Sequence, residues 1–406
     1  MSLRILLIAP TCDGEDVGES WFAHQWASRL GERHAVTLLT YHKRGHRPAR
    51  EQLPDVRVVE WQEPPLLGRA ERMNSMLMPG YLPFYWRARA WIKAALERGQ
   101  HFDVVHQPVP EAMRYPCPAT GLGIPIVLGP VGGSLRSPAL FAAEEPSNPW
   151  WVWLRGLDRY RLRHDPLLRQ TYESADCVLG IAPYVLEHLE ELKIRRFEAM
   201  PDVAMDVVRA PIDRIRPPDQ TVRALFVGRL VRTKGAFAAI TAMAACADLP
   251  LGLDIVGDGP DRAACEQLCS ELGLLDKVKF HGRVNRAAVD QFYDAADMFV
   301  FPSYREAGGS VVLEAMSRSL PLIVCNRGGP GATTISACAI KLPVVSPEQL
   351  AVDVATAMRY LVLHPELRLA MGRAAHGHLV RTGLWQHRIE RAEEIFRQLV
   401  SVKPGA

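Results

Sequence analysis

Residues 298–325 read MFVFPSYREAGGSVVLEAMSRSLPLIVC, the clearest strand–helix–strand unit in the sequence. An apolar run, Met298–Phe301, is followed by a loop with two glycines and then by helical periodicity over Ser310–Ser319. A second apolar run, Leu322–Cys325, comes directly afterwards. Two strands joined by a crossover helix run in the same direction. The stretch therefore predicts an α/β fold built on a parallel sheet.

The same alternation of short apolar runs and helical patterns extends through the chain on both sides. It pauses at residues 199–221, a proline-rich stretch that we interpret as a linker. We therefore predict two Rossmann-like, doubly wound domains, residues 1–200 and 201–384, that face each other across a cleft. A helix at about 385–406 is expected to pack back on the first domain, since its apolar residues share one face.

Composition limits the classes of function that remain. The 406 residues and 45.2 kDa allow two or three domains, and a net charge of +3 argues against dedicated nucleic-acid binding. The N-terminal apolar run is too short for a secretion signal, and no run approaches the ~18 apolar residues of a membrane span. The eight cysteines form no C-x-x-C pair, which favours free thiols and a cytoplasmic protein. Of the 48 basic residues, 40 are Arg, a bias that indicates a bacterial source.

Four stretches at predicted strand ends carry candidate chemistry, and the first is Phe226–Gly235, FVGRLVRTKG. Gly228 ends the strand and lets the backbone approach a ligand. Arg229 and Lys234 add two cations before the next helix begins, and a helix N-terminus favours an anion. The pattern indicates a diphosphate site, and the alternative is a surface turn with two solvated cations.

The second and third stretches are shorter. Ile255–Pro260, IVGDGP, places Gly257 at a strand end but lacks the third glycine of a dinucleotide fingerprint. Phe280–Val284, FHGRV, could set the backbone of Arg283 and Val284 beside a planar base. Each stretch is also consistent with an ordinary tight turn.

The fourth stretch, Glu306–Glu314, EAGGSVVLE, carries the strongest signal. Gly308 and Gly309 allow close backbone approach, and we expect Ser310 to cap the following helix. The free amides of that helix suit a phosphate, and the two glutamates can accept hydrogen bonds from sugar hydroxyls. The alternative is a salt-bridged surface glutamate together with a mid-helix one.

These four motifs, in this order, resemble those of GT-B fold glycosyltransferases, most closely family 4, over about residues 222–331. The resemblance implies transfer of a sugar from a nucleotide-diphosphate donor, with retention at the anomeric carbon and without a metal or other cofactor. A UDP-sugar is favoured and a GDP-sugar is the second option. The absence of an Asp-x-Asp sequence agrees with metal independence.

The resemblance also assigns roles by position. The implied catalytic set is Glu306, which would hold the sugar hydroxyls, Arg229 and Lys234, which would neutralise the diphosphate, and His106, which would lie near the transferred sugar. A structural histidine is the alternative for His106. The implied donor-binding set is Gly228, Gly257, Arg283, Val284, Gly308, Gly309, Ser310 and Glu314, with Glu314 on the ribose.

The first domain would bind the acceptor: a glycan, a lipid-linked molecule or a small molecule. Candidate acceptor residues are Asp13 and Glu15 in an acidic loop and Gly132, Gly133 and Arg136 at a glycine-rich strand exit. Residues 149–169 combine tryptophans with arginines, a composition suited to peripheral contact with the inner membrane face. Packing of the tryptophans in the core is the alternative there.

Two other functions remain open at this point. The same fold could serve a sugar-nucleotide epimerase or hydrolase, or a non-catalytic sugar-nucleotide-binding partner. One departure from the family pattern bears on the donor sugar: Ala307-Gly308-Gly309 replaces the common Pro-Phe-Gly.

Overall fold

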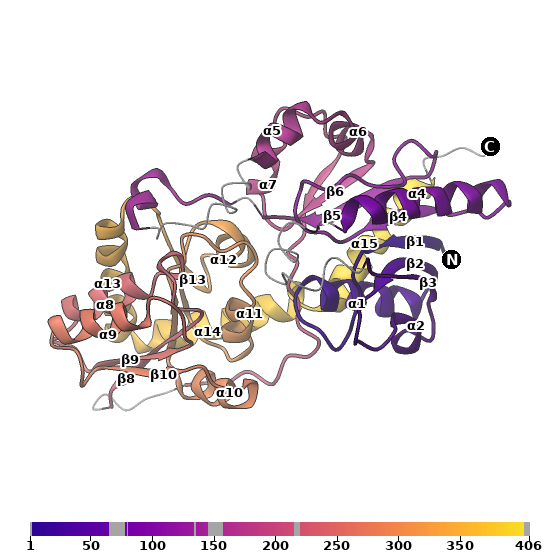
Figure 1. Cartoon of the computed structure of the whole chain (residues 1–406). Coiled ribbons are helices and arrows are strands. Elements are labelled where there is room, and N and C mark those ends of the chain that lie inside the picture. The colour runs from indigo at the N-terminus through magenta and orange to yellow at the C-terminus, as the bar shows by residue number, and fades with distance from the viewer. Residues whose placement is uncertain are drawn as a thin grey trace. The chain divides into compact units, whose positions relative to one another are not determined.

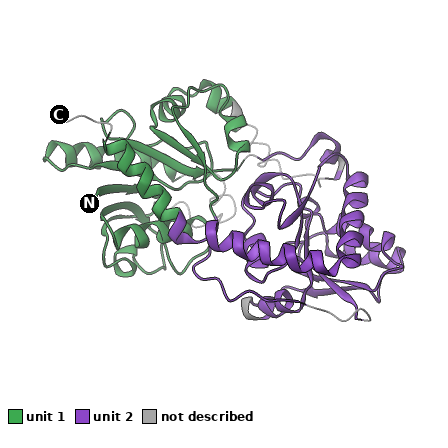
Figure 2. Ribbon diagram, turned by 180° about the vertical axis from the view of Figure 1, so that it is seen from behind, with its two compact units in different colours: residues 1–134, 150–202, 388–406 green, residues 135–149, 203–387 purple. Residues whose placement is uncertain are grey.

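The computed structural model describes residues 2–64, 78, 80–133, 135–144, 157–214 and 220–401. These fall into two compact units (Figure 2). The first comprises Met1–Ser134, Trp150–Asp202 and Arg388–Ala406, and the second Leu135–Pro149 and Val203–His387. The chain thus enters each unit more than once, and residues 135–149, from the first half of the sequence, belong to the second unit.

The first unit is built on a seven-stranded parallel sheet with the order β3-β2-β1-β4-β5-β6-β7 (Figure 1). The order runs outward from β1 in one direction and from β4 in the other, which is the doubly wound arrangement. Its strands are β1 (Arg4–Ile8), β2 (Ala35–His42), β3 (Arg57–Gln62), β4 (Val104–Gln107), β5 (Ile126–Val131), β6 (Cys177–Gly180) and β7 (Phe197–Ala199). The central strands β4, β5 and β6 are buried at every position, as expected for strands covered on both faces.

Helices connect these strands and cover the sheet. They are α1 (Glu19–Gly31), α2 (Ala49–Gln52), α4 (Tyr81–Glu97), α5 (Leu157–His164), α6 (Pro166–Ser174) and α7 (Tyr184–His188). The C-terminal helix α15 (Trp385–Ser401) belongs to this unit from residue 388 onward. Its apolar face is buried at Ile389, Ala392, Ile395 and Phe396.

The second unit has a six-stranded parallel sheet with the order β10-β9-β8-β11-β12-β13. Its strands are β8 (Val222–Val227), β9 (Leu251–Val256), β10 (Val278–Gly282), β11 (Met298–Phe301), β12 (Leu322–Cys325) and β13 (Ala339–Leu342). The helical segments are η2 (Ala139–Glu144), η4 (Arg232–Lys234), α8 (Ala236–Ala245), α9 (Arg262–Glu271), α10 (Arg286–Ala295), α11 (Ser310–Ser317), α12 (Gly328–Thr333), α13 (Pro347–Leu363) and α14 (Pro365–Thr382). The predicted pair of doubly wound parallel α/β sheets is confirmed.

The boundary between the two units falls at residues 202–203, within the proline-rich stretch 199–221, and described residues after it pack on the second unit. Val203 and Val208 pack against the core of the second unit, and Met205 pairs with Leu384 in an isolated bridge. The amide of Ile212 donates to Ser319 Oγ at 3.0 Å. Prolines interrupt the helical pattern here, but apolar residues between them still pack against the core of the second unit.

Two further findings bear on the protein's environment. All eight cysteines are free and buried. Within the described ranges, no helix has both the length and the apolar character that crossing a bilayer demands.

Candidate functional site

Three glycines bring together the carboxyl ends of β8, β9 and β10. The amide of Gly228 donates to Val256 O at 3.0 Å, and the amide of Gly257 donates to Gly282 O at 2.8 Å. Gly257 has φ of 136°, and a Cβ added there would lie 2.0 Å from the carbonyl oxygen of Gly228. Only glycine fits at this position, so the strand end of β9 presents backbone here rather than a side chain.

A second contact fixes the segment that carries Lys234. This lysine is the last residue of η4, and Gly235 follows it with φ of 82°. A Cβ at Gly235 would lie 2.2 Å from Pro302 O, and Ser303 Oγ donates to Thr233 O at 2.9 Å. The loop after β11 therefore holds η4 from both sides of Lys234.

The consequence of this packing is an ion pair between Lys234 Nζ and Glu306 Oε2. The two side chains are 22% and 17% exposed, so the pair is partly dehydrated and still open to a ligand. Glu306 Oε1 accepts no hydrogen bond from the residues that the structure describes. Arg229 is exposed and pairs with no carboxylate among those same residues. Among the described residues, Arg229 is thus an uncompensated cation and Glu306 Oε1 a free carboxylate oxygen of the site.

A second pair of glycines supports the Glu306 loop from behind. The amide of Gly329 donates to Glu306 O at 3.0 Å, and a Cβ at Gly328 would lie 2.0 Å from that same oxygen. A Cβ at Gly329 would lie 1.8 Å from Gly308 O. This supporting contact was not predicted; the glycine pair directly after the next strand was the only sequence signal for it.

The start of α11 differs from the prediction. Gly309 occupies the N-cap position with φ of 95°, and no side chain caps the helix. Ser310 is therefore the first helical residue and is exposed, rather than the capping residue. The reason is conformational, because a serine N-cap needs an extended backbone whereas this turn is left-handed. The amide of Val312 donates to Gly309 O at 3.0 Å, whereas among the described residues the amides of Ser310 and Val311 have no acceptor and remain available to an anion.

Glu314 and the end of β10 complete the site. Glu314 Oε2 accepts a hydrogen bond of 3.0 Å from the hydroxyl of Tyr293, a residue that is 1% exposed. Arg283 and Val284 directly follow Gly282, the first exposed and the second packed against the core. The tyrosine thus fixes the orientation of a carboxylate one turn inside α11.

All of the predicted donor-side residues follow strands of one parallel sheet, whose carboxyl ends share an edge. Gathered at this edge are Gly228, Arg229, Lys234, Gly257, Arg283, Val284, Glu306, Gly308, Gly309, Ser310 and Glu314. Cations, free helix amides and glycine backbone suit a phosphate group, and the carboxylates suit hydroxyl groups. This chemistry matches a phosphorylated, hydroxyl-rich ligand.

Both halves of the chain match known families. Residues 17–201 match the model described as Glycosyl transferase 4-like domain, and residues 211–378 match the one described as Glycosyl transferases group 1. The HepE protein of Anabaena, solved in complex with UDP, aligns with a TM-score of 0.63 over 98% of this chain and 100% of that chain, at 15% identity. The fold is that of the GT-B glycosyltransferases. In the GT-B arrangement found here, the candidate site lies wholly in the second unit.

Curated relatives share shorter segments with this GT-B chain. An uncharacterized glycosyltransferase of Methanocaldococcus jannaschii is 42% identical over 106 residues, which are 26% of this chain and 27% of the relative. A D-inositol 3-phosphate glycosyltransferase of Saccharomonospora viridis is 27% identical over 237 residues, 52% of this chain and 54% of the relative. The chain thus spans about a quarter of the first relative's length and about half of the second's.

In the GT-B chain, His106 lies in the core of the first unit, whereas the other predicted catalytic residues belong to the second unit. Its ring is fully buried and packs against Trp26 and Phe396, with centroid distances of 4.7 and 5.4 Å. Nε2 donates to Gly129 O at 2.8 Å. Burial lowers the pKa of His106 to about 4, so the ring is neutral at pH 7. This environment fits the structural alternative.

The candidate acceptor residues lie in both GT-B units. Asp13 is buried and accepts hydrogen bonds from Glu15 N at 2.9 Å and from Gln52 Nε2 at 3.1 Å. Gly132 N donates to the carbonyl of Glu111 at 2.6 Å, and Gly133 O accepts from the hydroxyl of Tyr184 at 3.1 Å. Arg136, by contrast, is exposed and belongs to the second unit. No observation links these five residues to an acceptor, and their role stays a prediction.

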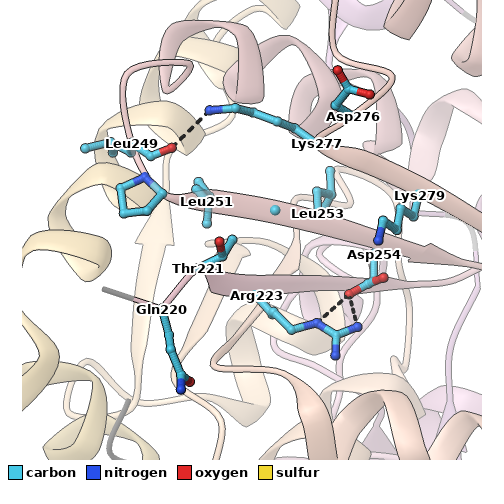
Figure 3. Close-up of a pocket in the computed structure, with 12 residues that line it drawn as sticks. Gln220, Thr221, Arg223, Leu249, Leu251, Leu253, Asp254, Asp276, Lys277 and Lys279 are labelled. Carbon is cyan, nitrogen blue, oxygen red and sulfur yellow. Dashed lines mark hydrogen bonds and ion pairs between the residues drawn. The ribbon is translucent and has the colours of Figure 1, made fainter. Parts of the chain in front are cut away.

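A cavity of about 600 Å³ in the second unit lies at the opposite edge of the sheet, at the amino ends of β8, β9 and β10 (Figure 3). Ligands of open α/β sheets bind instead at the carboxyl ends of the strands, and three of the cavity's charged side chains already have partners within the protein. Arg223 pairs with Asp254 at 2.7 Å, and Lys277 Nζ donates to Leu249 O at 3.0 Å. The cavity is therefore not the candidate site, despite its size.

Proposed function

We propose that the protein is a retaining glycosyltransferase that moves a sugar from a nucleotide-diphosphate donor, preferably a UDP-sugar and otherwise a GDP-sugar, to a hydroxyl of an acceptor. The observation that carries the proposal is the half-buried pair of Lys234 and Glu306, together with exposed Arg229 after a strand of the same sheet. This arrangement combines charge for a diphosphate with a carboxylate for sugar hydroxyls. The family matches over both halves support the same reaction class.

Each group has a distinct part in the proposed reaction. Arg229 and Lys234 stabilise the negative charge that develops on the departing diphosphate, a form of electrostatic catalysis. Glu306 Oε1 accepts a hydrogen bond from a hydroxyl group of the donor sugar. Glu314 accepts hydrogen bonds from the hydroxyl groups of the ribose. The amides at the start of α11 bind a phosphate or a sugar hydroxyl. We propose that the leaving phosphate takes the acceptor proton, so no side-chain base and no metal is required.

A nucleotide panel tests this proposal through thermal unfolding. The cognate donor at ~100 Kd is expected to stabilise the folded protein by ~2.7 kcal/mol, because it binds only the folded state. UDP, GDP, ADP and their sugar conjugates should be compared at equal concentration, with inorganic phosphate as the control. If none of the nucleoside diphosphates raises the melting temperature more than phosphate does, the proposed donor class is wrong.

Products then separate transfer from the two other functions considered. A transferase forms a glycosylated product only when an acceptor is present. An epimerase converts the donor sugar, and a hydrolase releases it, without any acceptor. A non-catalytic binding protein is stabilised by the donor but leaves it unchanged.

We also propose a cytoplasmic location, supported by eight free, buried cysteines that suit a reducing compartment. The acceptor class stays open between a glycan, a lipid-linked molecule and a small molecule. We propose that the first domain binds the acceptor, because the site residues of the second unit are all assigned to the donor.

Peripheral membrane contact through residues 149–169 is a further proposal, and residues 149–156 of that segment lie outside the described ranges. Tyr160 is 63% exposed and Leu167 41% exposed, as insertion would require. The arginines contribute less than expected, because Arg161 pairs with Asp165 and Arg169 with Glu173, both at 2.7 Å.

Vesicle co-sedimentation tests this contact. At low salt, the protein is expected to sediment with vesicles that contain anionic lipid but not with neutral ones, because surface charge adds to the apolar attraction. The variant Tyr160→Ser/Leu167→Ser should sediment less. Recovery of the wild-type protein in the supernatant with anionic vesicles would exclude the contact.

A further inference from the structure

A segment from the first half of the sequence forms part of the unit that carries the candidate site. Residues 135–144 follow β5 of the first unit by a few residues, yet they belong to the second unit (Figure 2). Their second half forms the short helix η2, which ends at Glu144. We call residues 135–144 the strap.

The strap is anchored by Phe141. Its side chain has no exposed surface and joins the hydrophobic core of the second unit. Its ring lies 4.3 Å, centroid to centroid, from the ring of Tyr304, at an angle of 41°. Tyr304 is two residues before Glu306 on the loop that follows β11, so the anchor contacts the segment that presents the carboxylate.

The beginning of the strap contacts the other support of Glu306. Leu135 Cδ2 would lie 2.9 Å from a Cβ at Gly328, and Arg327 donates to the carbonyl of Arg136. Gly328 itself packs against the carbonyl of Glu306. The strap therefore contacts the Glu306 loop both through Tyr304 and through the glycine pair behind it.

The end of the strap lies near the segment that carries Lys234. Glu144 is partly buried, which raises the pKa of its carboxyl, and the charge of Arg232 opposes that rise. Arg232 begins η4, and its guanidinium lies 3.4 Å from the centroid of the Phe237 ring at the start of α8. The last residue of the strap is thus close enough to η4, the helical turn of Lys234, for the charges of Glu144 and Arg232 to interact.

We propose that the strap holds Lys234 and Glu306 in the geometry that binds the donor, with Phe141 as a positioning residue. This inference rests on the proposed function, and it adds a requirement that the second half of the sequence does not contain. Without Phe141, Tyr304 loses the packing on one face of its ring. The loop after β11 then becomes more mobile. Because Ser303 Oγ in that loop donates a hydrogen bond to Thr233 O, η4 becomes more mobile as well. Small displacements of binding groups have large effects on turnover.

The test compares Phe141→Ala with Phe141→Leu in the full chain, using two readouts. Hydrogen exchange, measured without ligand, is expected to accelerate at least about 10-fold for amides of residues 303–309 and 232–235 in Phe141→Ala, because local opening becomes easier. Calorimetry with UDP as the probe should show binding weakened by about 10-fold, with a raised donor KM. Phe141→Leu should restore most of both.

Leu361→Ala is the matched control, since Leu361 is fully buried in the same core but lies on α13. At an equal loss of melting temperature, it should leave amide exchange in residues 303–309 and the UDP affinity unchanged. The proposed role of the strap would be wrong if Leu361→Ala changed amide exchange and UDP affinity as much as Phe141→Ala does. It would also be wrong if amide exchange in Phe141→Ala were the same as in the wild type. If the wild type binds no UDP or other nucleoside diphosphate, the proposed function fails, and the exchange readout still decides the strap.

Discussion

Replacement of Glu306 by alanine is expected to lower the rate of sugar transfer at least about 100-fold, the scale of losing one preorganised group at a charged transition state. The carboxylate is held by an ion pair with Lys234 and by the backbone contacts of Gly328 and Gly329. Its free oxygen therefore needs no reorganisation to accept a sugar hydroxyl. Initial rates at saturating acceptor, over a range of donor concentrations, measure the loss.

The same variant separates sugar recognition from nucleotide binding. Glu306 neutralises Lys234 in the free protein, so its removal leaves the lysine free for a phosphate. UDP is therefore expected to bind Glu306→Ala at least as tightly as it binds the wild type, although transfer falls. Glu366→Ala is the control, because Glu366 is exposed on α14. Wild-type transfer in Glu306→Ala, or a loss of UDP affinity equal to the loss of transfer, would contradict the assigned role.

The strands that the sequence predicts best are those buried on both faces. The observed bounds of β11 and β12 coincide with the predicted apolar runs Met298–Phe301 and Leu322–Cys325, since central parallel strands show little alternation with polar residues. The strands that were missed, β7 and β13, lie at the ends of their sheets. Their residues, FEA and AIKL, are partly exposed, and such short edge strands lack a clear apolar pattern.

The candidate site could be predicted as far as it depends on strand ends. Arg229, Lys234 and Glu306 each follow an apolar run, and parallel topology brings such positions to one edge. Contacts between segments that are distant in the sequence leave no comparable pattern in the sequence. Phe141 and Tyr304 are far apart in the sequence, and nothing in the spacing of either residue indicates that their rings meet. The strap therefore became visible only in the folded chain.

The error at Ser310 has a different origin. Serine is a preferred N-cap, and its place before a helical pattern made that role the natural prediction. The backbone turn at Gly309 is left-handed, however, and a Cβ there would lie 3.3 Å from both Glu306 Cγ and Pro330 Cγ. The tight packing of the Glu306 loop thus moves the helix start by one residue. The preference of serine for the N-cap position was therefore outweighed by the packing of Gly309 against Glu306 and Pro330.

Replacement of Lys234 by alanine is expected to reduce transfer by at least about 100-fold and also to weaken UDP binding, unlike the loss of Glu306. The lysine serves the diphosphate, which is common to the donor and to UDP. The weakening should diminish at high salt, which screens phosphate binding in the wild type as well. Lys279→Ala is the matched control, since Lys279 is exposed at the cavity on the opposite edge of the sheet. Equal losses in the two lysine variants would contradict a specific phosphate contact.

The double variant Lys234→Ala/Glu306→Ala tests whether the two residues act as a unit. Loss of Lys234 alone leaves a partly buried carboxylate without its partner, and the second substitution removes that charge. The loss of folding stability in the double variant is therefore expected to be smaller than the sum of the two single losses. UDP affinity should follow Lys234→Ala, because the phosphate contact is missing in both. Additive stability losses, measured by denaturant unfolding, would show that the pair is not coupled in solution. The donor would then meet two independent groups instead of a preformed ion pair.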